Sequence, residues 1–208
     1  MSFSFTPPNQ LTFLRIILTP VFLAFLLSED VTLRQVSLLI FAIALTTDWY
    51  DGWVARRWGY VTRWGTFLDP LADKVITSAA LIAFIYLDLA PPWTVWIIVA
   101  RDFLVTFLRS YAEFKGTPID TTRLAKTKTF TQFVVIFYVL LLYVAKDTEY
   151  FRVRFGELID QLLDYSILYS LMTAIAILTF WTGLLYIIDN WKIIRHLYAY
   201  TSRVTESE

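Results

Sequence analysis

Four aspartates lie at the ends of two strongly apolar runs, within the stretch from position 48 to 74, DWYDGWVARRWGYVTRWGTFLDPLADK. Asp48 and Asp51 are three residues apart, and Asp69 and Asp73 are four apart. Residues with these spacings share one face of an α-helix. If the two runs are antiparallel helices joined by the short segment between them, all four carboxylates can converge on one cavity.

Four carboxylates held close together need compensation, because neighbouring like charges cannot all stay ionised on their own. Protons or cations can supply it, and two hard divalent cations would balance four carboxylates. The sequence has no cysteine and one histidine, which excludes thiolate and zinc-type sites and favours Mg²⁺ or Mn²⁺. A pair of such ions is typical of phosphoryl chemistry. From the residues alone, a cation or proton transport site is the alternative.

Small residues and one arginine lie among the aspartates. Gly52 has no side chain and lets a ligand approach the backbone closely, while Ala55 and Gly65 keep the neighbouring turns small. Arg56 can pair with a phosphate group through two parallel hydrogen bonds. Charges that are merely solvated at helix ends are the simpler explanation, but carboxylates beside apolar spans are costly and indicate function.

The elements that must position these residues are membrane-spanning helices. The chain of 208 residues is 57% hydrophobic, its mean hydropathy is +0.57, and its apolar residues come in long blocks. A helix needs about 20 apolar residues to span a bilayer. We predict an all-α integral membrane protein with one domain over residues 1–208, in which the first apolar run is a retained helix and not a signal peptide. The six predicted spans are about 10–28, 33–57, 68–88, 92–115, 122–146 and 166–191.

Lysine and arginine residues in the connections predict the orientation, because they favour the cytoplasmic side. Six spans put both termini on one side, where the connections and ends hold ten of these residues: Arg56, Arg57, Arg63, Lys115, Arg123, Lys126, Lys128, Lys192, Arg195 and Arg203. The other side holds four: Arg34, Lys146, Arg152 and Arg154. We therefore expect cytoplasmic termini and an external segment 147–164 that holds a short amphipathic helix. The net charge of zero gives no reason to expect nucleic-acid binding.

The pattern Asp48-x-x-Asp51-Gly52-x-x-Ala55-Arg56-x8-Gly65-x3-Asp69-x3-Asp73 resembles the full signature of the CDP-alcohol phosphotransferase family in all fixed positions and spacings. The resemblance implies the six-helix membrane fold of that family, usually as a homodimer. It also implies transfer of a phosphatidyl or similar group from a CDP-linked donor to an alcohol, with release of CMP. The enzyme would lie in the inner (cytoplasmic) membrane with its active site facing the cytoplasm.

The resemblance also implies roles for single residues. Asp48, Asp51 and Asp69 would bind two metal ions, and Asp73 would lie beside the second ion and act as general base. The pocket for the CDP-linked donor, CDP-diacylglycerol, would be formed by Asp48, Gly52, Ala55, Arg56 and Gly65.

Three further segments, PPNQLTFLRIILTP, ARDFLVTFLRSYAEFKG and LAKTKTFTQ, resemble the branch of the family whose acceptor is sn-glycerol 3-phosphate. The resemblance covers roughly residues 7–135, and it departs from the branch at Asp102, where we expect glutamate. Inositol phosphate, phosphatidylglycerol and serine are the alternative acceptors within the family.

A phosphorylated acceptor needs a basic pocket. Arg109 is the first candidate, because it lies deep in the apolar run FLVTFLRSYAEF, where a free charge is costly. Lys126 and Lys128 are two residues apart, so they cannot share one face of a straight helix. Arg123 and Arg101 are the remaining candidates, although the cytoplasmic charge bias explains loop cations such as Arg123 without any substrate.

Overall fold

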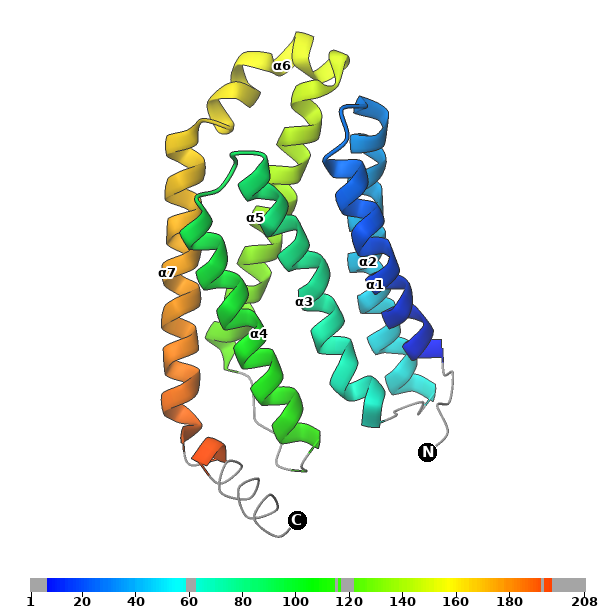
Figure 1. Ribbon diagram of the computed structural model, residues 1–208, viewed down its shortest axis with the longest axis vertical. Coiled ribbons are helices and arrows are strands. Elements are labelled where there is room, and N and C mark those ends of the chain that lie inside the picture. The colour runs from blue at the N-terminus through cyan, green and yellow to red at the C-terminus, as the bar shows by residue number, and fades with distance from the viewer. Residues whose placement is uncertain (1–6, 59–62, 115, 117–121, 192, 196–208) are drawn as a thin grey trace.

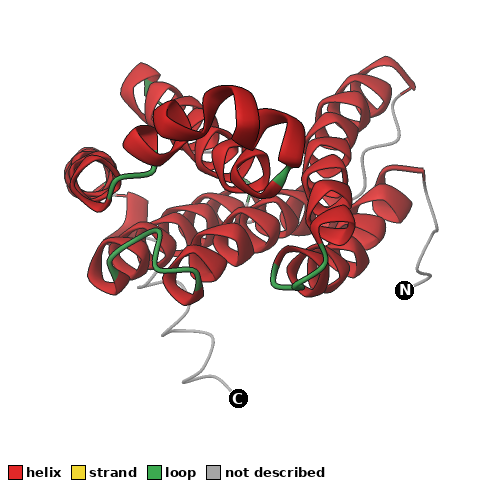
Figure 2. Cartoon of the chain, turned by 90° about the horizontal axis from the view of Figure 1, so that it is seen from above, coloured by secondary structure: helices red, strands yellow, loops and turns green. Residues whose placement is uncertain are grey.

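The computed structural model describes residues 7–58, 63–114, 116, 122–191 and 193–195, and within them the side chains of 7–12, 47–58, 63–69, 73 and 114 are left out of the description. The described residues form helices and connecting loops and no strand (Figure 2). The helices are α1 (Pro7–Leu26), α2 (Val31–Trp58), α3 (Arg63–Tyr86), α4 (Pro92–Phe114), α5 (Arg123–Asp147), α6 (Glu149–Leu162) and α7 (Tyr165–Asp189).

Helices α1 to α5 and α7 correspond one by one to the six predicted spans, and α6 is the short helix expected within 147–164. In the described part of the chain, α5 and α7 are each 25 residues long and are apolar enough over their length to cross a membrane. Helix α3 begins at Arg63, five residues before the predicted span, because the helix extends beyond the apolar run that defined the span. The all-helical architecture is thus confirmed, and the number of spans stays a prediction.

Local sequence signals explain several helix ends. Thr122 precedes α5, and its side chain accepts a hydrogen bond of 3.3 Å from the backbone N–H of Ala125. Asp164 precedes α7 and accepts a bond of 2.8 Å from the N–H of Ser166. Both residues are of the types preferred at this position, because their side chains satisfy N–H groups that have no partner within the helix. Helix α4 begins at Pro92, where the missing N–H of proline has no cost.

Helices α1 to α5 and α7 run along the length of the molecule, so their ends gather at two ends of a bundle, and α6 lies across one of them (Figure 1). We call the end where α2 ends at Trp58 and α3 begins at Arg63 the basal end; α4 and α7 also end there, and α1 and α5 begin there. The opposite end carries α6, and we call it the α6 end. Because α2 and α3 run in opposite directions, both aspartate pairs belong to the basal end.

Helix packing over the described residues places α1 against both α2 and α3, whereas α2 and α3 contact each other much less. The two helices that carry the aspartates run in opposite directions, as predicted (Figure 1). They contact each other little, however, and their principal common neighbour is α1. Helix α4 packs against α3 and α7, and α5 packs against α6, α7 and α2.

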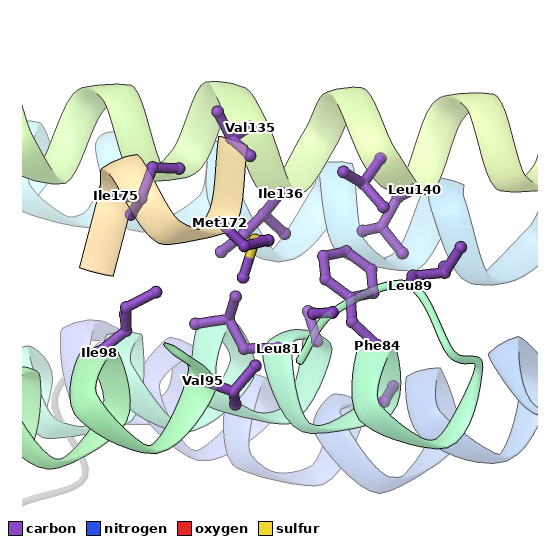
Figure 3. Packing of buried hydrophobic residues seen from close by; sticks show 14 of the residues in the cluster. Leu81, Phe84, Leu89, Val95, Ile98, Val135, Ile136, Leu140, Met172 and Ile175 are labelled. Carbon is purple, nitrogen blue, oxygen red and sulfur yellow. The ribbon is translucent and has the colours of Figure 1, made fainter. Parts of the chain in front are cut away.

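The main apolar core of the described residues lies in the half of the bundle toward the α6 end; α1 and α2 contribute to it, and Figure 3 shows the part between α3, α4, α5 and α7. Phe84 of α3 and Leu140 of α5 are fully buried there, and Met172 of α7 is 1% exposed. Side chains from all four helices point into this core: Leu81, Phe84, Val95, Ile98, Val135, Ile136, Leu140, Met172 and Ile175. Close packing of this kind fixes the helix positions on which the other half of the bundle depends.

Large apolar side chains also cover the outside of the bundle. Leu39 on α2 is 62% exposed, Leu104 on α4 49%, Leu141 on α5 46% and Ile177 on α7 63%. Exposed apolar surface of this extent marks a membrane-facing protein, because soluble proteins rarely leave such patches in water.

Candidate active site

The predicted metal ligands lie on two helices at the basal end. Asp48 and Asp51 belong to the last turns of α2, and Asp69 and Asp73 to the first turns of α3. The side chains of all four are outside the described part of the chain, so their convergence on one cavity stays a prediction. Among the described side chains, no group of three or more His, Cys, Asp or Glu residues could hold a metal ion.

The predicted donor-binding residues share this position. Gly52, Ala55 and Arg56 lie on α2 between the aspartates and Trp58, and Gly65 lies in the first turn of α3. Their side-chain surroundings also lie outside the description. What the structure adds is their placement on the same two helix ends as the aspartates.

A cavity of about 470 Å³ lies toward the basal end between α3, α4, α5 and α7. Its wall on α3 includes Pro70 and Lys74, which directly follow Asp69 and Asp73 in the sequence. The described lining residues are Pro70, Lys74, Arg101, Val105, Thr106, Arg109, Ala125, Lys126, Thr129, Phe130, Phe133 and Tyr186.

The cavity is strongly cationic. Lys74, Arg101, Arg109 and Lys126 line it, and no acidic residue is among its described lining residues. Phenylalanine and valine side chains form much of the remaining wall, and such apolar walls reduce the screening of charge inside. A small ligand with one or more phosphate groups matches this arrangement, because arginine and lysine are the usual partners of phosphate in proteins.

The buried carboxylate of Asp102 pairs with two of the lining cations, Lys74 and Arg101. Asp102 on α4 is 2% exposed, and its Oδ1 accepts a hydrogen bond from Nζ of Lys128, which is fully buried on α5. Nζ of Lys74 lies 3.4 Å from Oδ2 of Asp102, and Nη1 of Arg101 lies 3.2 Å from Oδ1. Three cations from three helices thus share one carboxylate, which leaves net positive charge beside the cavity.

Helix α7 contacts this network through Thr182. Nη2 of Arg101 donates a hydrogen bond of 3.2 Å to Oγ1 of Thr182. The Thr182 hydroxyl in turn donates to the backbone carbonyl of Leu178 at 2.9 Å. The guanidinium of Arg101 is therefore held on one side by its neighbour Asp102 and on the other side by α7.

The five residues predicted to bind the acceptor phosphate are placed in three different ways. Arg101, Arg109 and Lys126 line the cavity together. Lys128 does not line it and instead pairs with Asp102 in the protein interior. Arg123 is exposed at the start of α5 and is not among the lining residues.

Lys74 and Tyr186 line the cavity and are among the residues that escaped the sequence analysis. Lys74 had a usable signal, since it is a cation inside the apolar α3 and directly follows Asp73. Tyr186 had none, because a tyrosine in the apolar run of α7 resembles any aromatic residue near a membrane interface. Only the packing of α7 against α4 brings it to the cavity.

Comparisons with known proteins agree with this picture. The sequence model of the CDP-alcohol phosphatidyltransferase family matches residues 5–153. Three relatives share the name CDP-diacylglycerol–glycerol-3-phosphate 3-phosphatidyltransferase. The protein from Bacillus subtilis (strain 168) is 40% identical over 149 residues, which cover 66% of this chain and 77% of the relative.

The relative from Rickettsia felis is 36% identical over 135 residues, covering 64% of this chain and 74% of its own length. The relative from Salmonella paratyphi A is 37% identical over 142 residues, covering 65% and 77%. The matched residues contain both aspartate pairs and the α3, α4 and α5 walls of the cationic cavity. The chain therefore belongs to the CDP-alcohol phosphatidyltransferase family, as the aspartate signature predicted.

Proposed function

We propose that this protein transfers the phosphatidyl group of CDP-diacylglycerol to sn-glycerol 3-phosphate and releases CMP. The observation that carries the proposal is the cation-lined cavity of about 470 Å³, whose α3 wall is contiguous in sequence with Asp69 and Asp73. A cavity of this size and charge suits a small phosphorylated alcohol. The names of the relatives support glycerol 3-phosphate as that alcohol.

The family resemblance implies two divalent ions, Mg²⁺ or Mn²⁺, held by Asp48, Asp51, Asp69 and Asp73. The donor set fits this role, because hard divalent cations prefer carboxylate oxygens and two of them balance four carboxylates. The helix ends support it too, since α2 and α3 carry both pairs to the basal end (Figure 1). When bound, such ions supply positive charge for the phosphate oxygens of the donor.

The remaining chemistry belongs to side chains of the chain itself. Asp73 accepts the proton of the 1-hydroxyl group of glycerol 3-phosphate, and the oxygen of that group attacks the lipid-bearing β-phosphorus of the donor. The bond between this phosphorus and the bridging oxygen breaks, and CMP leaves with the electron pair. Arg56 pairs with a phosphate of the donor, and Asp48, Gly52, Ala55 and Gly65 form the nucleotide pocket around it.

The acceptor phosphate binds in the cationic cavity. Arg101, Arg109 and Lys126 supply direct contacts, with Lys74 on the side that leads toward Asp73. Lys128 contributes from behind, since it neutralises Asp102 and so leaves Arg101 and Lys74 with net positive charge for the ligand. Lining cations favour glycerol 3-phosphate over serine, which has no phosphate to bind.

We further propose six membrane spans with both termini and the basal end on the cytoplasmic side of the inner membrane. The lysine and arginine residues of the chain support this orientation, because ten in the connections and ends belong to that side and four to the other. The family resemblance supports a homodimer, and the packing of α7 against α4 and α5 supports a single domain over residues 1–208.

The test is CMP release by the purified full-length protein in detergent. With CDP-diacylglycerol and Mg²⁺, we expect CMP only when glycerol 3-phosphate is added, no CMP in excess EDTA, and recovery on addition of Mg²⁺ or Mn²⁺. Release with inositol phosphate, phosphatidylglycerol or serine instead would reassign the acceptor. The absence of CMP with every alcohol would contradict the proposal and favour the transport alternative.

A further inference from the structure

Helix α7 lies outside the residues that match the family, which end at 153, yet it forms one wall of the cationic cavity. Three buried residues of α7 lie on this side: Thr182, Gly183 and Tyr186. Thr182 and Tyr186 are four residues apart and Gly183 and Tyr186 three apart, so they share one face of the helix. This face packs against α4, which carries Arg101.

Gly183 leaves the space that the stem of Arg101 occupies. A Cβ atom at position 183 would lie 2.7 Å from Cγ and 3.2 Å from Nε of Arg101. The first distance is below any real carbon–carbon contact, so an alanine here would force Arg101 to move. Glycine in a helix interior costs about 1 kcal/mol relative to alanine. The close approach of Arg101 explains why the helix has a glycine at this position despite that cost.

Thr182 and Asp102 hold the other end of the same side chain. Nη2 of Arg101 donates to Thr182 at 3.2 Å, and Nη1 lies 3.2 Å from Asp102. With its stem against Gly183 and its guanidinium held on two sides, Arg101 has little freedom to leave the cavity wall. A preorganised cation binds an anion with less loss of side-chain entropy than a free one.

Tyr186 lines the same cavity and carries a buried hydroxyl group. Its side chain lines the cavity, it is 3% exposed, and its hydroxyl is buried with no hydrogen-bond partner among the described residues. A buried tyrosine hydroxyl usually finds a partner, because leaving it unpaired costs free energy. An anionic oxygen between Arg101 and Tyr186 would accept from both.

We propose that α7 determines how the cavity binds its anion. Thr182 and Gly183 are positioning residues that fix Arg101, and Tyr186 donates a hydrogen bond to an oxygen of the bound phosphate group. The inference rests on the proposed function only in taking that group to be the phosphate of the acceptor alcohol.

The test is binding of inorganic phosphate and of glycerol 3-phosphate to the purified full-length protein in detergent, measured by calorimetry. Gly183→Ala and Thr182→Val should each raise both Kd values about tenfold, and Tyr186→Phe should raise them several-fold, because each loses a hydrogen bond to a charged group or its alignment. Thr182→Ser keeps the hydroxyl and should bind like the wild type.

Matched controls separate this role from a general effect on the helices. Thr173→Val removes another buried hydroxyl of α7 that has no hydrogen-bond partner in the described part of the chain, and Gly156→Ala adds a Cβ whose nearest contact, Arg152, is an ordinary 3.9 Å away. Both should leave the Kd values unchanged. If Gly183→Ala does not fold, Thr182→Val and Tyr186→Phe, which hardly change side-chain volume, still decide the question.

Steady-state kinetics give an independent readout. The α7 variants should raise KM for glycerol 3-phosphate and leave KM for CDP-diacylglycerol unchanged. Unchanged Kd values in Gly183→Ala and Thr182→Val, or a wild type that binds neither anion, would overturn the inference. A wild type that binds phosphate but releases no CMP would overturn the proposed function and leave the inference standing.

Discussion

Helices α3, α4, α5 and α7 have two halves of opposite chemistry. Toward the α6 end they meet in a core of apolar side chains such as Phe84 and Leu140, both fully buried (Figure 3). Toward the basal end the same helices bury Asp102 and Lys128, which are 2% and 0% exposed, and enclose a cavity lined by four cations.

The contrast between the apolar half and the charged half separates interactions that stabilise the bundle from interactions suited to ligand binding. Apolar packing is the main stabilising interaction of the α6 half. In the basal half, taking charges out of water is costly, and even a paired buried charge rarely stabilises a protein more than apolar residues would. The charges of the basal half are thus consistent with the ligand-binding role proposed above, and its geometry depends on the packed apolar half next to it.

The largest expected effect is on activity at the basal end. Asp73→Asn removes the proposed general base without changing the size of the side chain. We expect kcat for CMP release to fall roughly 10³-fold, which is within the usual contribution of acid–base catalysis. Thermal stability should stay close to that of the wild type. A variant that keeps more than a tenth of the activity would exclude Asp73 as the base.

The second effect concerns the stability of the buried network. Asp102→Asn leaves Lys74, Arg101 and Lys128 without their shared carboxylate, and removal of one partner from a buried ion pair costs about 3 kcal/mol or more. We expect this loss of unfolding free energy in denaturant titrations in mixed micelles.

The double variant Asp102→Asn/Lys128→Met sharpens that measurement, because it removes the buried cation together with its partner. Part of the lost unfolding free energy should return. The affinity for phosphate should remain below that of the wild type, because Arg101 still lacks the carboxylate that holds it. As a control, Lys146→Met changes a lysine that is 52% exposed in an ion pair with Asp160, and it should shift the unfolding free energy by less than about 0.5 kcal/mol. Equal losses of unfolding free energy in Asp102→Asn and Lys146→Met would contradict the buried network.

The third effect tests the apolar half. Phe84→Ala opens space in the core and should lower the unfolding free energy by about 2 kcal/mol, which is below the roughly 3–5 kcal/mol usual for this change, because helices in a bilayer associate without a hydrophobic driving force. KM for glycerol 3-phosphate should not change. A large rise in KM with little loss of stability would show that the two halves are not separable as described.

The smallest effect lies at the α6 end, where Arg34 of α2 pairs with Asp147 at the end of α5. The side chains are 16% and 32% exposed, so the pair is only partly shielded from solvent. Asp147→Asn should cost about 1 kcal/mol at low salt and less at high salt. Asp160→Asn, in a pair whose side chains are 52% and 62% exposed, should cost nothing measurable, and an equal cost at both positions would refute the comparison.

Much of the fold was predictable because its signals are local. Runs of about 20 apolar residues predicted the existence of the long helices, and Thr122, Asp164 and Pro92 explain where three of them begin. Helix ends were less predictable, as the early start of α3 at Arg63 shows. An apolar run marks only the part of a helix that would lie within the bilayer, and the helix can extend beyond it.

The site was predictable to a smaller extent. The spacing of the aspartates and the charge of Arg101, Arg109 and Lys126 identified the relevant end of the bundle and three lining residues. Asp102 stood out only as a departure from the glutamate expected there, and its part in joining three cations had no sequence signal. Thr182 and Tyr186 had none either, since they lie more than 70 residues from Arg101 in the chain.

The sequence by itself determined the helices, the family and the aspartate signature, because periodicity and spacing are properties of short stretches of chain. Only the tertiary structure decided which cation does what. Lys126 and Lys128 are two residues apart on α5, and the angle between their directions sends one into the cavity and the other to Asp102 in the interior. That choice depends on where α4 and α7 pack, which no local pattern specifies.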